Sequence, residues 1–393
     1  MEKQNKVYKI IFAGGGTGGH IYPGLAVADQ LKIEAEKKDI TLEIYWIGNK
    51  EGMDRDLVEK NLVPNGGSIT AFYGIPCGKL RRYFSLKNFI DFFKIIKGYF
   101  ESRSLIKKIK PDCLFSKGGF VSVPPCWAAK RLKVPYYTHE CDFTPGLATR
   151  LNSKGAKNIL LSYEETKKYF PTLQDKCIVT GNPVRPVFYS DQAASGKSFL
   201  GIPEDNKKLV LLVLGGSSGA MQINDLIVEN LSWLKERFIL VHQTGQVLAK
   251  KNPLLLHSSD SLYKPYAFIY SEMPAVIQAA DLIISRAGAN SLWECAVCSK
   301  AMLLVPLCGS GTRGDQVDNA KYFESKGAAY TLVGDEVNSQ SLKNTLELLL
   351  DKQNRDALSN SCKKLCGSTL PSKNIADIVL KGILGESSKC NYQ

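Results

Sequence analysis

The chain has 393 residues, of which 44% are hydrophobic and 23% charged, an ordinary composition for a globular protein of about two domains. No apolar run reaches the roughly 18 residues of a membrane-spanning helix, which excludes an integral membrane protein. The N-terminal segment lacks the apolar core of a secretory signal, and 11 scattered cysteines are too few for a disulfide scaffold. We therefore expect a cytosolic chain with reduced thiols.

The net charge of +13 is concentrated in the first half of the chain. Residues 1–184 hold 29 basic and 18 acidic side chains, and residues 79–110 alone hold ten Lys and Arg against two Asp and Glu. An asymmetry of this kind indicates that one domain has an anionic partner.

Short apolar runs alternate with helical stretches, which predicts α/β domains with parallel sheets. We expect strands over 7–13, 42–47, 112–116, 134–138 and 158–162, and again over 209–214, 238–242, 266–270, 281–285 and 301–306. Each series opens with a buried strand that runs into glycines. This pattern predicts two Rossmann-like domains, 1–184 and 185–393, which face a ligand cleft. Whether the final helix packs back on the first domain stays open.

The first glycine loop, 14–19, matches the dinucleotide pattern G-x-G-x-x-G after a strand. A nicotinamide enzyme needs an acidic residue after its second strand, where this chain has Asn49-Lys50. A ligand-free turn is the alternative, but the second loop at 215–219 favours phosphate or sugar binding. His20 follows the first loop directly, where an imidazole is suited to proton transfer, although a lone histidine is usually structural.

A second candidate site begins after the strand that ends at Ser285. Small residues at 287–291 leave backbone N–H groups at a helix start for a diphosphate, and Glu294, one turn later, is suited to hold the two ribose hydroxyls. The alternative is an ordinary capped helix with a solvated glutamate.

Segment 79–110 combines an apolar helix face with basic residues. The face consists of Phe89, Phe92, Phe93, Ile96 and Phe100, and the flanking cations are Lys79, Arg81, Arg82, Lys87, Lys94 and Lys97. It is either a core-packing helix with a solvated side or an interfacial element that rests on anionic lipid. No nucleic-acid-binding module accompanies the charge, so we expect no nucleic-acid partner.

Two metal-like patterns are discounted. Asp54-Arg55-Asp56 resembles a DxD motif, but we place it in a helix-like stretch far from a strand end. The pairs Cys295/Cys298 and Cys362/Cys366 lie in helical surroundings without a nearby histidine, which favours buried thiols over zinc.

Eight motifs, in a fixed order along the chain, are similar to those of one known protein family. They are 14–28, 117–124 (KGGFVSVP), 138–140 (THE), 180–185 (TGNPVR), 214–220, 242–245 (HQTG), 272–294 and 315–320 (DQVDNA). With these motifs the chain, from about residue 8 to 380, resembles the MurG family, the UDP-N-acetylglucosamine–lipid I glycosyltransferases of peptidoglycan synthesis. The resemblance implies a GT-B fold and a reaction without an active-site metal or cofactor.

Residue roles also follow from the resemblance. Thr17, Gly18 and Gly19 match the loop at the sugar-diphosphate end of the donor, Arg185 and Ser217 match diphosphate contacts, and Ile269 matches the backbone contact to uracil. Gln316 matches a residue that binds the GlcNAc hydroxyls. The stretch that matches the diphosphate and ribose contacts is Ala289, Asn290, Ser291, Leu292, Trp293 and Glu294.

The chain departs from the family at two amides. Asp142 stands where the family has an asparagine that contacts the donor sugar, and an ionised carboxylate accepts but does not donate. Asp315 replaces the first residue of a Gln-Gln pair and follows a longer loop, GSGTRG.

The implied reaction moves GlcNAc from UDP-GlcNAc, with inversion, to the 4-hydroxyl of MurNAc in lipid I to give lipid II. His20 is the candidate base, or it positions the acceptor. The implied location is peripheral, on an anionic membrane surface at the cytoplasmic face of the cell (inner) membrane, where other cell-wall enzymes that serve cell shape and division are further candidate partners. The rival readings are a glycerolipid glycosyltransferase that uses a UDP-sugar and a non-catalytic, membrane-docked UDP-binding scaffold.

Overall fold

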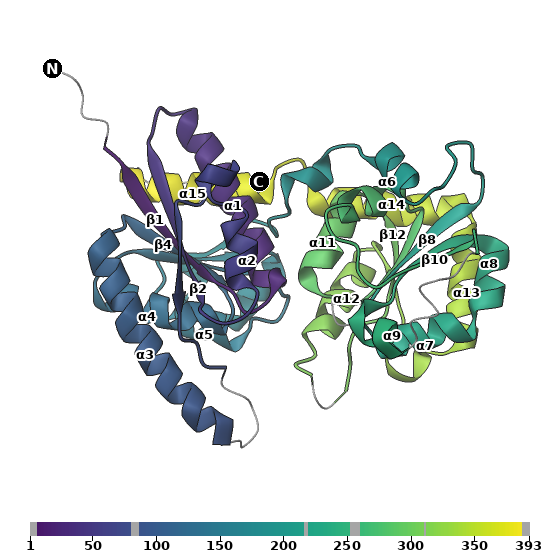
Figure 1. The fold of residues 1–393 in the computed structure, drawn as a ribbon, viewed down its shortest axis with the longest axis horizontal. Coiled ribbons are helices and arrows are strands. Elements are labelled where there is room, and N and C mark those ends of the chain that lie inside the picture. Colours follow the sequence, from purple (N-terminus) through teal and green to yellow (C-terminus); the bar gives the residue numbers. More distant parts are fainter. Residues whose placement is uncertain (1–5, 80–85, 216–218, 252–259, 310–311, 387–393) are drawn as a thin grey trace. The chain divides into compact units, whose positions relative to one another are not determined.

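The computed structural model describes residues 6–79, 86–215, 219–251, 260–309 and 312–386, with the backbone alone for 86–88. The chain divides into two compact units, Met1–Arg185 with Thr369–Gln393, and Pro186–Ser368. Each unit is a parallel sheet covered by helices (Figure 1). We describe each unit by itself.

The first unit contains a seven-stranded parallel sheet in the order β3-β2-β1-β4-β5-β6-β7. Helices α1 and α15 cover one face, where the core includes Phe12, Trp46 and Phe115. Helix α4 and the C-terminal part of α3 pack on the other face. Its elements are β1 (Tyr8–Gly14), α1 (Gly18–Glu36), β2 (Leu42–Asn49), α2 (Asp54–Glu59), η1 (Val63–Asn65), β3 (Ala71–Ile75), α3 (Leu86–Ile109), β4 (Cys113–Gly118), η2 (Phe120–Ser122), α4 (Val123–Arg131), β5 (Tyr136–Glu140), α5 (Leu147–Ser153), β6 (Asn158–Leu161), η3 (Glu164–Tyr169), η4 (Gln174–Lys176), β7 (Cys177–Val179) and α15 (Pro371–Leu384).

The second unit contains a six-stranded parallel sheet in the order β10-β9-β8-β11-β12-β13. Strands β8 and β11 are continuous apolar runs because both of their faces are covered. Its elements are η5 (Pro186–Tyr189), α6 (Ala193–Phe199), β8 (Leu209–Leu214), α7 (Met221–Glu229), α8 (Leu231–Arg237), β9 (Phe238–Gln243), α9 (Gly245–Lys251), β10 (Tyr263–Tyr266), α10 (Met273–Ala279), β11 (Leu282–Ser285), α11 (Ala289–Val297), β12 (Ala301–Leu304), α12 (Asp315–Ser325), β13 (Tyr330–Thr331), η7 (Gly334–Glu336), α13 (Ser339–Leu350) and α14 (Lys352–Cys366).

The expected strands differ from the observed ones at the edges of the two sheets. The strand expected over 266–270 is wrong, because the strand is β10 over Tyr263–Tyr266. The remaining edge strands, β3, β7 and β13, have no counterpart among the expected strands. Edge strands have one neighbour, so Pro265, which cannot donate to a sheet, is tolerated in β10.

The last helix, α15, belongs to the first unit. It packs against α1, and Ile375, Ile378 and Val379 are buried in the core with Phe12. The chain therefore passes between the units twice, at 185–186 and at 368–369. Among the described residues, no helix combines the length and the apolarity needed to cross a bilayer.

Candidate functional site: two strand edges

The glycine loop of the first unit joins β1 to α1. Gly16 has a φ of +83°, and a Cβ there would lie 2.5 Å from the Phe120 ring, so only glycine fits. Thr17 is the exposed N-cap of α1, and Gly18 and Gly19 are partly exposed at its first turn. The loop therefore presents backbone to solvent.

His20 lies in the first turn of α1, and its backbone N–H donates to the Thr17 carbonyl at 3.1 Å. Its ring packs on Gly119, where a Cβ would lie 2.7 Å from Cδ2 and 3.1 Å from Nε2. Gly119 follows β4, so the predicted motif at 117–124 meets the first glycine loop at this imidazole. His20 is partly exposed and can reach a ligand.

Arg185 lies in the first unit. Its guanidinium stands over the ring of Tyr22, 4.7 Å from the centroid, and a Cβ at Gly18 would touch the same ring at 3.3 Å. Tyr22 was not among the predicted site residues, although its position four residues after Gly18 places it on the same face of α1.

The turn after β5 is shaped by Glu140. Its carboxylate accepts from the N–H groups of Cys141 at 2.9 Å, Asp142 at 3.0 Å and Gly146 at 2.9 Å. Within the described residues, Glu140, Cys141 and Asp142 are the group whose ligand atoms lie within 4.8 Å of one another. Because the Glu140 oxygens already accept peptide N–H groups, we assign no metal to them.

His139 is fully buried beside Lys117 and the 180–185 motif. Its Nε2 lies 3.0 Å from the Gly181 carbonyl, which can only accept, so Nε2 carries the proton. Burial, with the Lys117 charge in addition, holds the pKa of His139 well below its usual range. His139 is therefore a neutral structural residue.

In the second unit, buried polar side chains fix the carboxyl ends of the strands. His242 lies 3.0 Å from Asn224 Oδ1 and 3.1 Å from the Tyr263 hydroxyl, and burial lowers its pKa to about 4. The Asn224 amide donates to the Thr244 carbonyl at 2.8 Å. Ile269 donates its N–H to Gln243 Oε1 at 3.0 Å, so this N–H is already occupied.

Helix α11 begins after Gly288, its N-cap, and has no acidic residue in its first turn. Leu292 and Trp293 are 1% and 5% exposed, so their side chains are closed to a ligand, and the Leu292 N–H donates to the Gly288 carbonyl at 3.0 Å. Asn290 and Glu294 are partly exposed and Ser291 is exposed. The Asn319 amide of α12 donates to the Ala287 carbonyl at 3.1 Å and holds the turn.

The 315–320 motif forms the start of α12. Gln316 accepts the Leu307 N–H on Oε1 at 2.9 Å, which leaves its amide N–H groups as the donors for a ligand. Asp315 pairs with Arg313 of the longer loop at 2.8 Å. Arg313 of this loop therefore neutralises the charge of Asp315, which stands where the family has an amide.

Several predicted residues lie outside the described residues. These are Ser217, Arg81 and Arg82, together with the side chain of Lys87. Lys79 is described and exposed.

One prediction about Asp54 is wrong. Asp54 does begin helix α2, but it is not far from a strand end, because its carboxylate accepts the N–H of Asn49, the last residue of β2, at 2.7 Å. The sequence does not show that Asp54 lies near the end of β2, because a short turn that folds back on its own strand leaves no periodic signal. Of the discounted cysteines, Cys295 and Cys362 are buried, and Cys298 and Cys366 are partly exposed.

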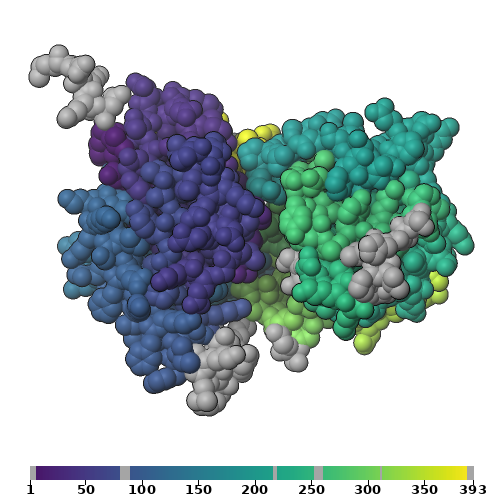
Figure 2. Space-filling model, in the orientation of Figure 1, coloured from purple at the N-terminus to yellow at the C-terminus, as the bar shows by residue number. Residues whose placement is uncertain are grey.

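The aromatic face of α3 is exposed, so the core-packing alternative fails for this part of the helix. Phe89 is 68% exposed and Phe100 59%, whereas Ile106 and Ile109 near the helix end are buried. The remaining exposed members of the face are Phe92, Phe93 and Ile96. Helix α3 lies along the surface of the first unit, in the blue region of the space-filling view (Figure 2).

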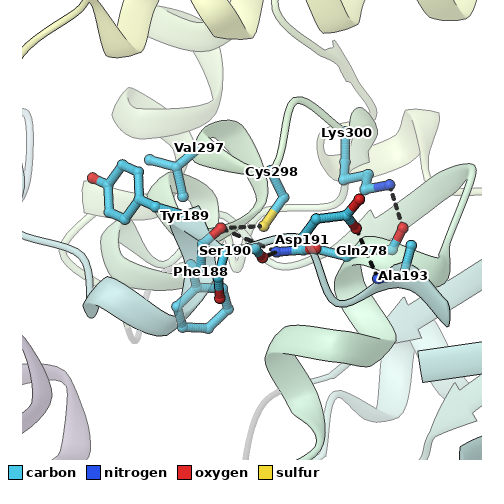
Figure 3. Close-up of a pocket in the computed structure, with 9 residues that line it drawn as sticks. All are labelled: Phe188, Tyr189, Ser190, Asp191, Ala193, Gln278, Val297, Cys298 and Lys300. Carbon is cyan, nitrogen blue, oxygen red and sulfur yellow. Dashed lines mark hydrogen bonds between the residues drawn. The ribbon is translucent and has the colours of Figure 1, made fainter. Parts of the chain in front are cut away.

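A pocket of about 360 Å³ in the second unit has none of the predicted site residues in its lining (Figure 3). It is lined by η5, by the start of α6 and by the ends of α10 and α11, next to the amino ends of β11 and β12. Lys300 donates to the Gln278 and Ala280 carbonyls at 2.7 and 2.8 Å, and Cys298 donates to the Phe188 carbonyl at 3.4 Å. Ligands of parallel sheets bind at the carboxyl ends, so we assign this pocket a structural role.

Comparison with known proteins covers both units. Residues 10–161 match the glycosyltransferase family 28 N-terminal domain, and residues 210–377 match its C-terminal domain. A relative from Treponema denticola is 50% identical over 337 residues, 84% of each chain, and one from Lachnoclostridium phytofermentans is 38% identical over 355 residues, 90% of this chain and 94% of that one. Both are named UDP-N-acetylglucosamine–N-acetylmuramyl-(pentapeptide) pyrophosphoryl-undecaprenol N-acetylglucosamine transferase.

Solved structures agree with these matches. MurG of Acinetobacter baumannii has a TM-score of 0.71 at 25% identity and covers 95% of this chain and 99% of that one. A UDP-GlcNAc 2-epimerase from Neisseria meningitidis, at 17% identity and a TM-score of 0.62, shares the fold. The architecture is the GT-B fold, and the chain belongs to glycosyltransferase family 28 and, within it, to the MurG family.

Proposed function

We propose that this chain transfers N-acetylglucosamine from UDP-N-acetylglucosamine to the muramyl sugar of lipid I, which gives lipid II for peptidoglycan. The observation that carries the proposal is the 50% identity to a transferase of that name over 337 residues, a stretch longer than either unit. A glycerolipid transferase would share the donor half, whereas this likeness extends into the first unit as well.

The proposed step is a single displacement at C1 of GlcNAc. The 4-hydroxyl oxygen of MurNAc attacks C1, the bond from C1 to the diphosphate oxygen breaks, and UDP leaves with that electron pair, so the configuration inverts. The hydroxyl proton passes to a base. His20, partly exposed at the end of the glycine loop, is our candidate for this base, and positioning the acceptor is its alternative role.

The second unit supplies most of the proposed donor contacts. We assign the stabilisation of the charge that develops on UDP to two groups, the backbone N–H groups at the start of α11 and the Arg185 guanidinium of the first unit. Glu294 accepts hydrogen bonds from the ribose hydroxyls, the Ile269 carbonyl accepts from uracil, and the Gln316 amide donates to the GlcNAc hydroxyls. Ser217 and Asp142 complete the proposed set, in which Asp142 acts as an acceptor only.

We also propose that α3 docks this chain, as a peripheral protein, on the anionic cytoplasmic face of the cell membrane. The exposed rings of Phe89, Phe92 and Phe93 support this, because a soluble protein rarely leaves such a cluster on one helix face. Lys97 on the same helix adds attraction of about 1 kcal/mol near an anionic surface. The acceptor carries a prenyl chain, so docking would bring the first unit to its sugar.

The deciding experiment measures UDP release from UDP-GlcNAc, without added metal, in the presence and absence of a short-chain lipid I analogue. We expect release that depends on the analogue. UDP-GlcNAc binding without release would support the scaffold alternative, and release only with a diacylglycerol acceptor would support the glycerolipid alternative.

A further inference from the structure

A buried carboxylate lies beneath the glycine loop of the first unit, and the proposed reaction gives it no role. Asp54, the first residue of α2, is 1% exposed. The Gly16 N–H donates to its Oδ1 at 2.8 Å and to its Oδ2 at 3.0 Å, and the Asn49 N–H donates to Oδ2 at 2.7 Å. One side chain thus joins the loop after β1 to the end of β2.

The glycines around Asp54 make room for this carboxylate. A Cβ at Gly15 would overlap the Asp54 carboxyl group, and a Cβ at Gly48 would lie 3.3 Å from Asp54 Cβ. In a phosphate-binding loop, missing side chains let the backbone approach a phosphate. Here the space at Gly15 is filled by an anionic group of the protein itself.

The arrangement has an energetic cost that a turn alone does not require. Burial raises the pKa of the Asp54 carboxyl, and the hydrogen bonds from Asn49 and Gly16 oppose that rise. A buried carboxylate is tolerated when donors of this kind compensate it. A buried titratable group with a shifted pKa at the edge of a site points to a functional role.

We propose that Asp54 is a positioning residue that fixes the glycine loop and, through it, His20. Because Asp54 accepts the Gly16 N–H, it also prevents this N–H from binding a phosphate. The path is short, because the next residue, Thr17, accepts the N–H of His20 at 3.1 Å. An oxyanion at the Gly16 N–H would meet the carboxylate, so this turn faces an uncharged part of the substrate, such as a sugar hydroxyl.

The kinetic test, which rests on the proposed function, compares Asp54→Asn with Asp56→Asn. Asparagine keeps the shape but loses one acceptor for the two peptide N–H groups. We expect kcat per folded molecule to fall about 10- to 100-fold, as for a displaced catalytic group, while the donor KM and the Kd for UDP stay within about threefold. Asp56 is exposed on the same helix, so Asp56→Asn should match the wild type.

Two kinetic outcomes would overturn the proposal. One is a wild-type kcat in folded Asp54→Asn, and the other is a raised donor KM at constant kcat. A purely structural role would lower the folded fraction, measured by thermal melting, and leave kcat per folded molecule unchanged.

A second measurement needs no variant. In the wild type labelled with ¹⁵N-glycine, the Gly16 amide proton should exchange slowly and keep its chemical shift when inorganic phosphate is added. A phosphate-induced shift at Gly16 would contradict the closed N–H. Since this readout does not depend on GlcNAc transfer, it separates a failure of the Asp54 proposal from a failure of the proposed function.

Discussion

The two units hold their strand edges with groups of different charge. In the first unit, Asp54 and Lys117 are both buried, at 1% exposure, next to the glycine loop. In the second unit the corresponding edge is fixed by the neutral side chains of Asn224, His242 and Asn319 and by the Arg286 guanidinium, which donates to the Val305 carbonyl at 2.9 Å. Two glycine-rich turns that look alike in sequence thus differ in their electrostatics. We propose that the edge of the second unit meets the anionic donor and that the edge of the first unit orients the reacting hydroxyl.

The largest effect should come from His20 in the first unit. His20→Gln removes the candidate base, so we expect kcat to fall about 100- to 1000-fold. UDP affinity, measured by calorimetry, should stay constant, because most of the proposed donor contacts belong to the second unit. An unchanged kcat would show that His20 is not the base. A loss of UDP affinity would contradict the assignment of the donor contacts to the second unit.

The second unit should lose stability in acid because of His242. Its pKa is about 4 when folded and about 6.5 for an ordinary histidine, so the unfolded chain binds more protons between these values. The free energy of unfolding should therefore fall by about 3 kcal/mol as the pH drops through this window. Urea unfolding at several pH values tests this, and His242→Gln should flatten the slope. An equal slope in the variant would contradict a neutral His242.

Glu294 tests whether the second unit binds the donor. Glu294→Gln weakens the proposed acceptor for the ribose hydroxyls, so the donor KM should rise about tenfold or more with kcat nearly constant. Glu324→Gln, at an exposed position on α12, is the matched control. Constant donor kinetics in Glu294→Gln would reject the ribose assignment.

Lys117 tests how much stability a buried charge at the strand edge of the first unit costs. Among the described residues, its buried amino group has no hydrogen-bond partner. Lys117→Met should therefore raise the free energy of unfolding by about 1 to 2 kcal/mol. Lys130→Met, at an exposed position on α4, should change little. Destabilisation by Lys117→Met in urea melts would mean that water satisfies the amino group.

The smallest effect concerns the membrane face of the first unit. Phe93 is 54% exposed, so Phe93→Ser should lower partitioning into anionic vesicles about fivefold, since about 1 kcal/mol of apolar contact is lost. Trp127, 40% exposed on α4, offers a control that lies off the α3 face. Equal sedimentation of Phe93→Ser and wild type with vesicles would argue against docking through α3.

The expected strands are confirmed at the centres of the sheets, whereas at the edges they are wrong or missing. Central strands such as β8 (LVLLVL) are buried on both faces, so an unbroken apolar run identifies them. Edge strands such as β10, with Lys264 and Pro265, are shaped by one neighbour and carry no comparable pattern. The exposure of the α3 rings could not be predicted either, because an apolar helix stripe looks the same whether or not a partner covers it.

The sequence by itself determined the two series of buried strands, their glycine turns and the motif order that identifies the family, because these are properties of neighbouring residues. The tertiary structure decided which side chains hold those turns. Asp54 meets Gly16 across 38 residues, Arg185 meets Tyr22, and α15 returns to α1 from the far end of the chain. Such contacts depend on how strands order themselves in a sheet, which fixes long-range neighbours that no local pattern encodes.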